Sequence, residues 1–408
     1  MNNIPELKQT ALQKLITRFT TAPNLVLTKM FGSDRYESED IYWEAQIGNR
    51  GIMPFAAEDA PAPMIGIEGV SGHQAHAAFW KEKAYLGASF MNNIREPGDS
   101  RKHYAATKML ARETNKLRNR CDRRKEWMFC QMLTNGSFTY LDKRGNKVSV
   151  DYGIPSTHFP ELEAARKWDQ DTSKVLEDWF DIVEFFEYHA QAPITHVMVT
   201  SEVVRAMVLN KGVQSLLTKS AFGDGDLMTR PAEVLRALLG VQNFMVNNEM
   251  YEVRCWMTSA LSAGTGPHTI YVDEVKDIAV GDTIYGVRVS DDGGKPTLTE
   301  AMTVTATSAT AGTITATGTI TTALRSQSDY IYTVRKFLPT NRFTVFAETV
   351  EGQKLAEFAE APFDLDRHYG MKVDRNFKWD PDGVFIRVQN KGLPVLFFED
   401  AVYSVEVL

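Results

Sequence analysis

Cysteine is scarce in this chain of 408 residues: Cys121, Cys130 and Cys255 are the only three. Three cysteines are too few for a disulfide framework, and no two of them have the close spacing that metal-binding cysteines share. The sequence therefore predicts a protein of a reducing compartment.

Long apolar runs are also missing. No stretch approaches the roughly 20 apolar residues that a membrane-spanning helix needs. The first residues, MNNIPELKQTALQKL, lack the apolar centre of a signal peptide. The net charge of −7 argues against a protein that holds nucleic acid by its overall charge. These absences predict a soluble protein made in the cytosol.

Catalytic signatures are absent as well, including a phosphate loop, a dinucleotide glycine fingerprint, G-x-S-x-G and H-E-x-x-H. Gly223–Asp226 resembles the start of a calcium loop but lacks the later ligands, so we interpret it as a solvated turn. His73 and His76 have no third ligand nearby and are interpreted as surface histidines. Asp364 and Asp366 are expected on one solvent face of a strand. We predict no catalytic residue, metal site or cofactor.

Threonine, in contrast, is concentrated in one stretch. Residues 303–323 read TVTATSATAGTITATGTITTA, with ten threonines and no charge. Small and apolar residues alternate with threonine, which predicts a β-hairpin with one buried face. Ala311-Gly312 marks its turn. Because residues 260–335 contain only strand and turn patterns, we predict that they form an inserted small β domain.

A single long helix is predicted over residues 99–134, between Pro97-Gly98 and Asn135-Gly136. It holds ten Lys and Arg against four Asp and Glu. We interpret this basic character as a solvated face rather than a nucleic-acid site. An eleven-residue spacing predicts one narrow buried stripe: Ala106, Leu110, Leu117, Cys121, Met128 and Met132.

The rest of the chain mixes helices and strands. Residues 172–257 predict an amphipathic helix with core aromatics, a buried strand (ITHVMVT), two further helices and a final strand pair. The strand-rich end is expected to turn at Asn390–Gly392 and again at Glu399-Asp400. The core aromatics of the first helix are expected to be Trp179, Phe180, Phe185 and Phe186.

Residues 49–98 are rich in Gly, Pro and Ala and contain no helical period. A segment of this length without a core of its own is unusual in a compact domain. It could be an active-site lid, or an extended arm that packs on a neighbouring subunit.

Three stretches and their order carry a resemblance to a known family. They are LTKMFGSDRYESEDIYWEAQIG, LRNRCDRRKEWMFCQMLTNGSFTYLDKRGNKVSVDYG and FKWDPDGVFIRVQNKGLPVLFFEDAVYSVEV. In this order they resemble the major capsid proteins of tailed bacteriophages, specifically the lambda-like capsid family with the Hong Kong 97-type fold. The resemblance spans most of the chain, apart from the inserted β domain.

The resemblance implies an α+β fold and a division of the chain. The implied parts are an N-terminal arm (1–45), an extended E-loop over an adjacent subunit (46–98), a peripheral domain with its spine helix (99–171), an axial domain (172–259), the inserted β domain (260–335) and a return to the axial and peripheral domains (336–408). Candidate contact residues between subunits are Pro54, Phe55, Phe79, Trp80, Tyr85, Phe90, Arg101, Arg120, Arg123 and Arg124.

The implied function is structural and not enzymatic. Such proteins self-assemble into hexamers and pentamers of an icosahedral head around double-stranded DNA, first as a precursor shell that then expands. The implied partners are other copies of the chain, a separate scaffolding protein, a portal, a decoration protein and non-specifically contacted DNA, with no membrane. The implied location is the virion, after synthesis in the host bacterial cytoplasm. We expect the β insertion to project from the outer surface or to cover a neighbour there.

Two alternatives remain. A hydrolase could use residues 49–98 as a lid and the β insertion as a carbohydrate-binding module, but it would need convergent polar groups that the sequence does not supply. A tail-tube or baseplate subunit is a second alternative. The long helix and the single long excursion of the chain at residues 49–98 disfavour it.

Overall fold

The computed structural model describes residues 7–408, except residues 20–21, 23, 47–54, 56–68, 88–99, 142–146, 171–172, 218–228, 274, 276–277, 290–296, 309 and 380–381. The chain divides into two compact units. We call Met1–Asn247 with Leu338–Leu408 the main unit, and Asn248–Phe337 the β unit.

Helix α4, Ser100–Asn135, is the longest helix of the described chain and confirms the helix predicted over residues 99–134. It ends at Gly136, whose φ of 65° is the left-handed conformation in which glycine closes helices. The predicted apolar stripe is confirmed, since all six of its residues are buried.

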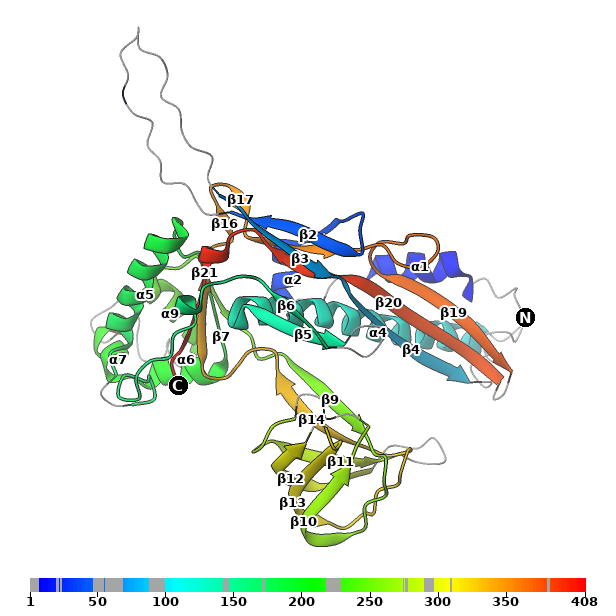
Figure 1. The fold of residues 1–408 in the computed structure, drawn as a ribbon. Helices are drawn as coiled ribbons and strands as arrows, with labels where there is room; N and C mark the ends of the chain where they lie inside the picture. The colour runs from blue at the N-terminus through cyan, green and yellow to red at the C-terminus, as the bar shows by residue number, and fades with distance from the viewer. Residues whose placement is uncertain are drawn as a thin grey trace. The chain divides into compact units, whose positions relative to one another are not determined.

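A five-stranded sheet packs on this stripe. Its strands are β1 (Ser33–Arg35), β4 (Ala78–Gly87), β18 (Ala356–Glu360), β19 (Lys372–Trp379) and β20 (Asp382–Leu396). Helix α4 lies along β4 and β20, and helix α1 (Gln9–Arg18) packs beside β19 (Figure 1). The shared core joins Leu12 and Ile16 of α1 to Leu110 of α4 and to Val384 and Ile386 of β20.

The turn predicted at Asn390–Gly392 is wrong, because β20 continues through these residues for 15 residues in all. Asn390 and Lys391 are fully buried within it. Gly392 is needed there because β18 lies too close for a side chain: a Cβ atom would be 2.3 Å from the Ala359 carbonyl oxygen. The glycine therefore marks a close backbone approach and not a turn.

Two shorter hairpins and a small ribbon complete this part of the main unit. Strand β2 (Asp40–Ala45) pairs with β3 (Ser71–His76) and buries Ile41, Trp43 and Ala45. The other pairs are β5 (Ser137–Leu141) with β6 (Lys147–Asp151), and β16 (Thr349–Val350) with β17 (Gln353–Lys354). Since β3 and β4 pair with the chain's own strands, residues 71–87 of the predicted excursion are packed within the subunit.

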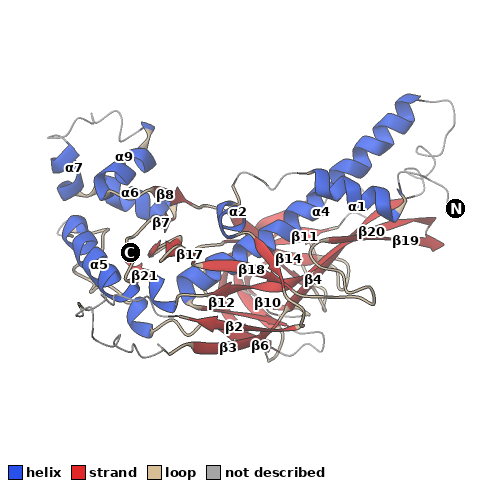
Figure 2. Cartoon of the chain, turned by 90° about the horizontal axis from the view of Figure 1, so that it is seen from above, coloured by secondary structure: helices blue, strands red, loops and turns tan. Residues whose placement is uncertain are grey.

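A four-stranded sheet organises the remaining part of the main unit, which we call the lobe. Its order is β21 (Val402–Glu406), β15 (Arg342–Phe346), β7 (His196–Val199) and β8 (Asn243–Val246). Its helices are α5 (Val175–Ala190), α6 (Ser201–Leu209), α7 (Lys211–Leu217) and α9 (Pro231–Leu239). Figure 2 shows these helices gathered at the end of the main unit that is opposite α1.

The strand pair predicted near residues 241–257 is wrong. Strand β8 pairs in parallel with β7, whereas the next strand, β9 (Met250–Trp256), belongs to the β unit. The boundary between the units falls between the two strands, at Asn247 and Asn248. Adjacency in sequence therefore misled the prediction, because each strand has its partner elsewhere.

The β unit has one six-stranded antiparallel sheet and no helix among its described residues. The order is β10 (Gly264–Tyr271), β13 (Thr313–Ile320), β12 (Thr297–Ser308), β11 (Thr283–Arg288), β14 (Tyr330–Lys336) and β9. The unit begins at Asn248, upstream of residue 260. Its buried core includes Cys255, Ile284, Ile314 and Ile331.

The threonine-rich hairpin is the β12–β13 pair. Val304, Ile314 and Ala316 are buried, and the threonines between them point mainly to solvent. The register shifts between Val304 and Ala306, so Ala306 is exposed although the alternation predicted it on the buried face. A β-bulge of this kind exchanges the two faces of a strand from that point onward.

Candidate functional site

Among the described residues, no group of three His, Cys, Asp or Glu side chains could hold a metal ion. None of the described helices combines the length and the apolar character that crossing a membrane requires. The Gly223–Asp226 segment lies outside the described residues.

Asp364 and Asp366 lie in a turn and not in the predicted strand. Both carboxylates accept hydrogen bonds from Lys372 Nζ, at 3.0 Å and 2.8 Å. The hydrogen bond from Lys372 holds the pKa of Asp366 below its ordinary value. Asp366 is thus kept ionised by a lysine, which suits a structural ion pair and not a general acid.

His73 is less exposed than the sequence predicted, with 19% of its side chain accessible. Its Nε2 lies 2.5 Å from Glu399 Oε1, and its ring stacks on Trp43 with centroids 5.4 Å apart. His76, at 38% exposure, contacts Asp40 Oδ1 through Nδ1 at 2.7 Å. Each histidine therefore helps to fasten β3 to β2, through Trp43 for His73 and through Asp40 for His76.

The contact candidates on β4 pack largely within the subunit. Trp80 Nε1 donates to Cys121 Sγ on α4 at 3.1 Å. The Phe79 ring lies 5.8 Å from that of Phe363. Tyr85 lies 5.1 Å from the Phe385 ring and keeps 42% of its surface exposed. Of these three, Tyr85 is the most available to a neighbouring subunit.

The remaining candidates divide between α4 and the excursion. Arg120 Nε pairs with Glu82 Oε2 of β4 at 2.6 Å, and the Arg124 guanidinium lies over the Trp127 ring at 5.0 Å. Arg123 is partly buried on α4, and Phe55 is fully exposed. Pro54, Phe90 and the Arg101 side chain lie outside the described residues.

Some charged residues of α4 are buried, although the sequence analysis interpreted the charges of this helix as a solvated face. Glu126 is completely buried and accepts from the Leu27 and Thr28 backbone N–H groups, at 3.0 Å and 2.8 Å, and from Thr28 Oγ1 at 2.7 Å. It thereby caps helix α2 (Val26–Phe31). Burial raises the pKa of Glu126, and these hydrogen bonds oppose the rise.

Two lysines are buried in the same region. Lys125 Nζ donates to Glu360 Oε1 at 2.9 Å and lies 4.6 Å from the centre of the Phe358 ring. Lys391 of β20 is paired with Glu39 Oε2 at 2.6 Å. Both ion pairs join segments that are far apart in sequence: the Lys125 pair ties α4 to β18, and the Lys391 pair ties β20 to the segment that enters β2. No local sequence signal distinguishes these lysines from exposed ones.

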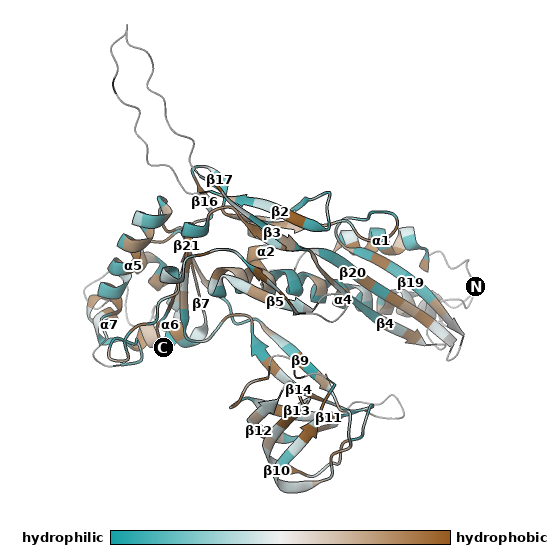
Figure 3. Cartoon of the chain, in the orientation of Figure 1, coloured by the Kyte–Doolittle hydropathy of each residue, from teal (hydrophilic) through white to brown (hydrophobic). Residues whose placement is uncertain are grey.

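Helix α5 presents an acidic and aromatic outer surface. Phe180 and Tyr188 are 68% and 71% exposed, and Asp181, Glu184 and Glu187 are exposed beside them. Figure 3 shows hydrophilic and hydrophobic residues alternating along this helix. Trp179 and Phe186 are core residues as predicted, but the prediction for Phe180 is wrong because it faces away from the lobe. Exposed aromatics of this kind favour a contact surface.

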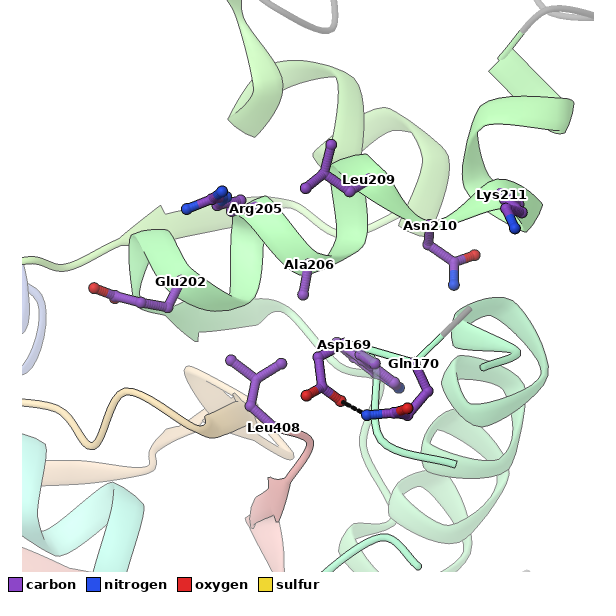
Figure 4. A pocket seen from close by; sticks show the side chains of 10 residues that line it. Asp169, Gln170, Glu202, Arg205, Ala206, Leu209, Asn210, Lys211 and Leu408 are labelled. Atoms are coloured by element: carbon purple, nitrogen blue, oxygen red, sulfur yellow. Dashed lines mark hydrogen bonds between the residues drawn. The ribbon is translucent and has the colours of Figure 1, made fainter. Parts of the chain in front are cut away.

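A cleft of about 330 Å³ lies beside α6 in the lobe (Figure 4). Residues of α6 line it together with Asp169, Gln170 and Leu408, and Ala206 of α6 points toward Leu408 and Asp169. Gln170 Nε2 donates to Asp169 Oδ1 at 3.0 Å. Its lining contains the carboxylates of Asp169 and Glu202 but no His, Cys or Ser, so it offers no Ser–His or Cys–His pair.

Comparison with known proteins gives a consistent result. A family model described as phage major capsid protein E matches residues 8–281. A structure described as the capsid protein of a prophage from E. coli CFT073 has a TM-score of 0.54 at 14% identity, and covers 98% of this chain and 99% of that one. No curated protein sequence matches the chain.

A phage-related protein from Bordetella bronchiseptica RB50 has a TM-score of 0.51 at 10% identity, and covers 97% of this chain and 96% of that one. At such low identity these structures show a shared fold. They confirm the mixed α+β fold that the sequence predicted.

Proposed function

We propose, from the premise that this chain belongs to the phage major capsid protein E family, that it assembles with copies of itself into the hexamers and pentamers of an icosahedral head enclosing double-stranded DNA. The family is a structural one, and a capsid role follows from membership. The arrangement in capsomers, and a precursor shell that later expands, are the parts that we propose.

One observation carries the proposal: the family match spans residues 8–281, and the capsid-type fold covers nearly the whole chain. The geometry of the described residues agrees with it. A shell subunit needs rigid elements to keep its shape. Lys125 ties α4 to β18 through Glu360, and Lys391 ties β20 to Glu39 beside β2.

The domain roles are likewise proposals. Residues 46–98 would form the E-loop over a neighbour, with β3 and β4 as its base within the subunit. Helix α4 would be the spine of the peripheral domain (99–171). The axial domain (172–259) would lie in the lobe up to residue 247, and its last residues belong to the β unit. The outer surface of α5 and the exposed Tyr85 and Phe55 would then contact other subunits.

We propose that the β unit is an insertion in the capsid fold that strengthens the particle from its outer surface. Its ends support insertion, because Met250 and Lys336 are paired on neighbouring strands, so that the unit enters and leaves the chain at one place. A threonine-coated sheet face suits exposure to solvent or contact with another capsomer. Particle maps that placed this unit inside the shell would contradict the proposal.

The proposed partners are a separate scaffolding protein, a portal, a decoration protein and the packaged DNA. The protein would be made in the host cytoplasm and would end in the virion head.

Electron microscopy of the purified full chain, alone and with its scaffolding protein, tests the proposal. Closed shells, or rings of five and six subunits, are expected. Monomers under both conditions, at high concentration and over a range of salt, would overturn it.

A further inference from the structure

The next inference rests on the proposed shell function and concerns the surface of the subunit that contacts the packaged DNA. We infer that four cations along the outer face of α4 form a binding ridge for the phosphate backbone of double-stranded DNA. The basic ridge consists of Lys108, Arg112, Lys116 and Arg120, and all four side chains are exposed.

The spacing of the ridge is regular. Its members follow one another at four-residue intervals, which places each cation about 6 Å further along the helix axis than the last. They therefore present four positive charges over about 18 Å. DNA carries one phosphate for each roughly 3.4 Å of axis on each strand, so a backbone that passes along the ridge offers a phosphate to every cation.

The ridge lies on the side of α4 that is opposite its core. At 100° per residue, the four cations occupy one arc, and Leu110, Leu117 and Cys121 occupy the other side, where they pack on the sheet. Three charges further along α4 behave differently, because Asp122, Lys125 and Glu126 are buried. Burial thus removes these three charges from the surface, whereas the ridge and Arg124 remain exposed.

Local carboxylates neutralise the ridge only in part. Lys116 Nζ pairs with Glu113 Oε1 at 2.7 Å, and Arg120 pairs with Glu82 Oε2. Both partners of each pair retain surface exposure, with Lys116 at 53% and Arg120 at 52%. Exposed pairs of this kind contribute roughly 0–1 kcal/mol, so exchange of a carboxylate for a phosphate is cheap.

The occupant follows from charge complementarity. A line of flexible cations suits the regularly spaced phosphates of a polyanion, and contacts to phosphate carry no sequence information. Duplex DNA is the polyanion that the proposed shell would enclose. The overall charge of −7 does not oppose local binding, because salt screens charges that lie more than about 8–10 Å away.

Fluorescence anisotropy tests the inference, with the full chain and a labelled 20-bp duplex over a salt series. Four neutralised phosphates predict a slope of log K against log salt of about −3.6 from the ridge. In the variant K108Q/R112Q/K116Q/R120Q, the slope of log K against log salt should be less negative than in the parent chain by up to about 3.6. The variant should also bind the duplex at least about tenfold more weakly at low salt. A second duplex of different sequence should bind equally well.

The matched control is K81Q/K83Q/R205Q/K354Q, which removes the same charge from exposed positions elsewhere on the main unit. It should bind DNA nearly as the parent chain does. Equal losses in the two variants would overturn the inference, because only net charge would then matter. Binding of polyglutamate but not of the duplex would also overturn it and would indicate an acidic protein as the occupant.

Failure of this inference can be told apart from failure of the proposed function. If the parent chain forms shells normally and the ridge variant binds DNA as tightly as the parent does, the inference about the ridge is wrong and the proposed capsid function still stands. Circular dichroism and the unfolding midpoint of each variant check that the four exposed substitutions leave the fold intact.

Discussion

At the residue scale, burial gives identical side chains opposite roles. Lys116 stands in solvent on α4, whereas Lys125, nine residues later on the same helix, is 9% exposed and holds Glu360. The helix is amphipathic in its first half and buried on most sides in its second half, because α2, β15, β18 and β21 pack around it there. The same residue type therefore serves the surface in one half and the interior in the other.

The cysteines provide a test at this scale. All three are free and buried, and desolvation raises the pKa of the Cys121 thiol to about 12. Since the thiolate is the reactive form, none should react with a thiol reagent at pH 8 in the folded chain. Ellman titration should count no thiol before unfolding and three after it. Rapid labelling of the native chain would show that the core around α4 opens readily.

Two buried histidines predict the pH dependence of stability. Burial lowers the pKa of His158 and of His196 from the ordinary value near 6.5, against the opposing effect of Asp400 and Glu348. The unfolded chain therefore binds protons at a higher pH than the folded chain does. Stability should be full above about pH 7 and should fall as the pH drops from about 6.5 toward the lowered pKa values.

Urea unfolding between pH 7.5 and 5 measures this dependence, before most carboxylates begin to titrate. The double variant H158Q/H196Q should be less stable overall but should show a flatter profile in that window. An unchanged slope would mean that other groups control the acid sensitivity.

At the scale of elements, helix α2 depends on a residue that is distant in sequence. It spans only six residues, and its own N-cap, Leu25, makes no side-chain hydrogen bond. A helix this short is not stable by itself, because nucleation is unfavourable. Glu126 of α4 supplies the missing acceptors and so couples α2 to the spine helix.

The substitution Glu126→Gln should therefore destabilise the chain by about 1–3 kcal/mol. The Leu27 and Thr28 donors now share two carboxylate oxygens, whereas the glutamine amide would offer them only one acceptor oxygen. Chemical denaturation measures the change. Glu113→Gln is the matched control on the same helix, and it should cost less than about 1 kcal/mol because it breaks only the surface pair with Lys116. Equal costs for the two variants would contradict the capping role.

At the scale of the whole molecule, the two units have separate cores. The core of the β unit is formed by residues between Val253 and Ile331, and the described core around α4 includes none of them. Each unit thus buries apolar surface of its own, which is what an independently folding domain requires.

Replacement of residues 248–337 by a short Gly-Ser linker should leave the main unit folded. The reason is that the β unit leaves the chain through neighbouring strands, at Met250 and Lys336. Circular dichroism and microscopy of the shortened chain should show a cooperative fold and assemblies like those of the parent. An insoluble or molten product would mean that the main unit depends on the β unit.

The sequence by itself determined the elements whose signal is local. The spine helix, its six-residue stripe, the β2 alternation and the threonine-rich hairpin all follow from periodicity and from glycine at the turns. These patterns are reliable because burial on one face fixes the residue type at every third or fourth position of a helix and at every second position of a strand.

Only the tertiary structure decided the features that depend on distant partners. Residue 392 is glycine because the Ala359 carbonyl lies too close for a side chain, and not because the chain turns there. Strand β8 does not pair with β9, because it pairs in parallel with β7. The buried charges of Lys125, Glu126 and Lys391 became visible in the same way, through Glu360, Thr28 and Glu39. The physical reason is common to all: such contacts join residues far apart in the chain, and no local pattern records which distant group will face a given side chain.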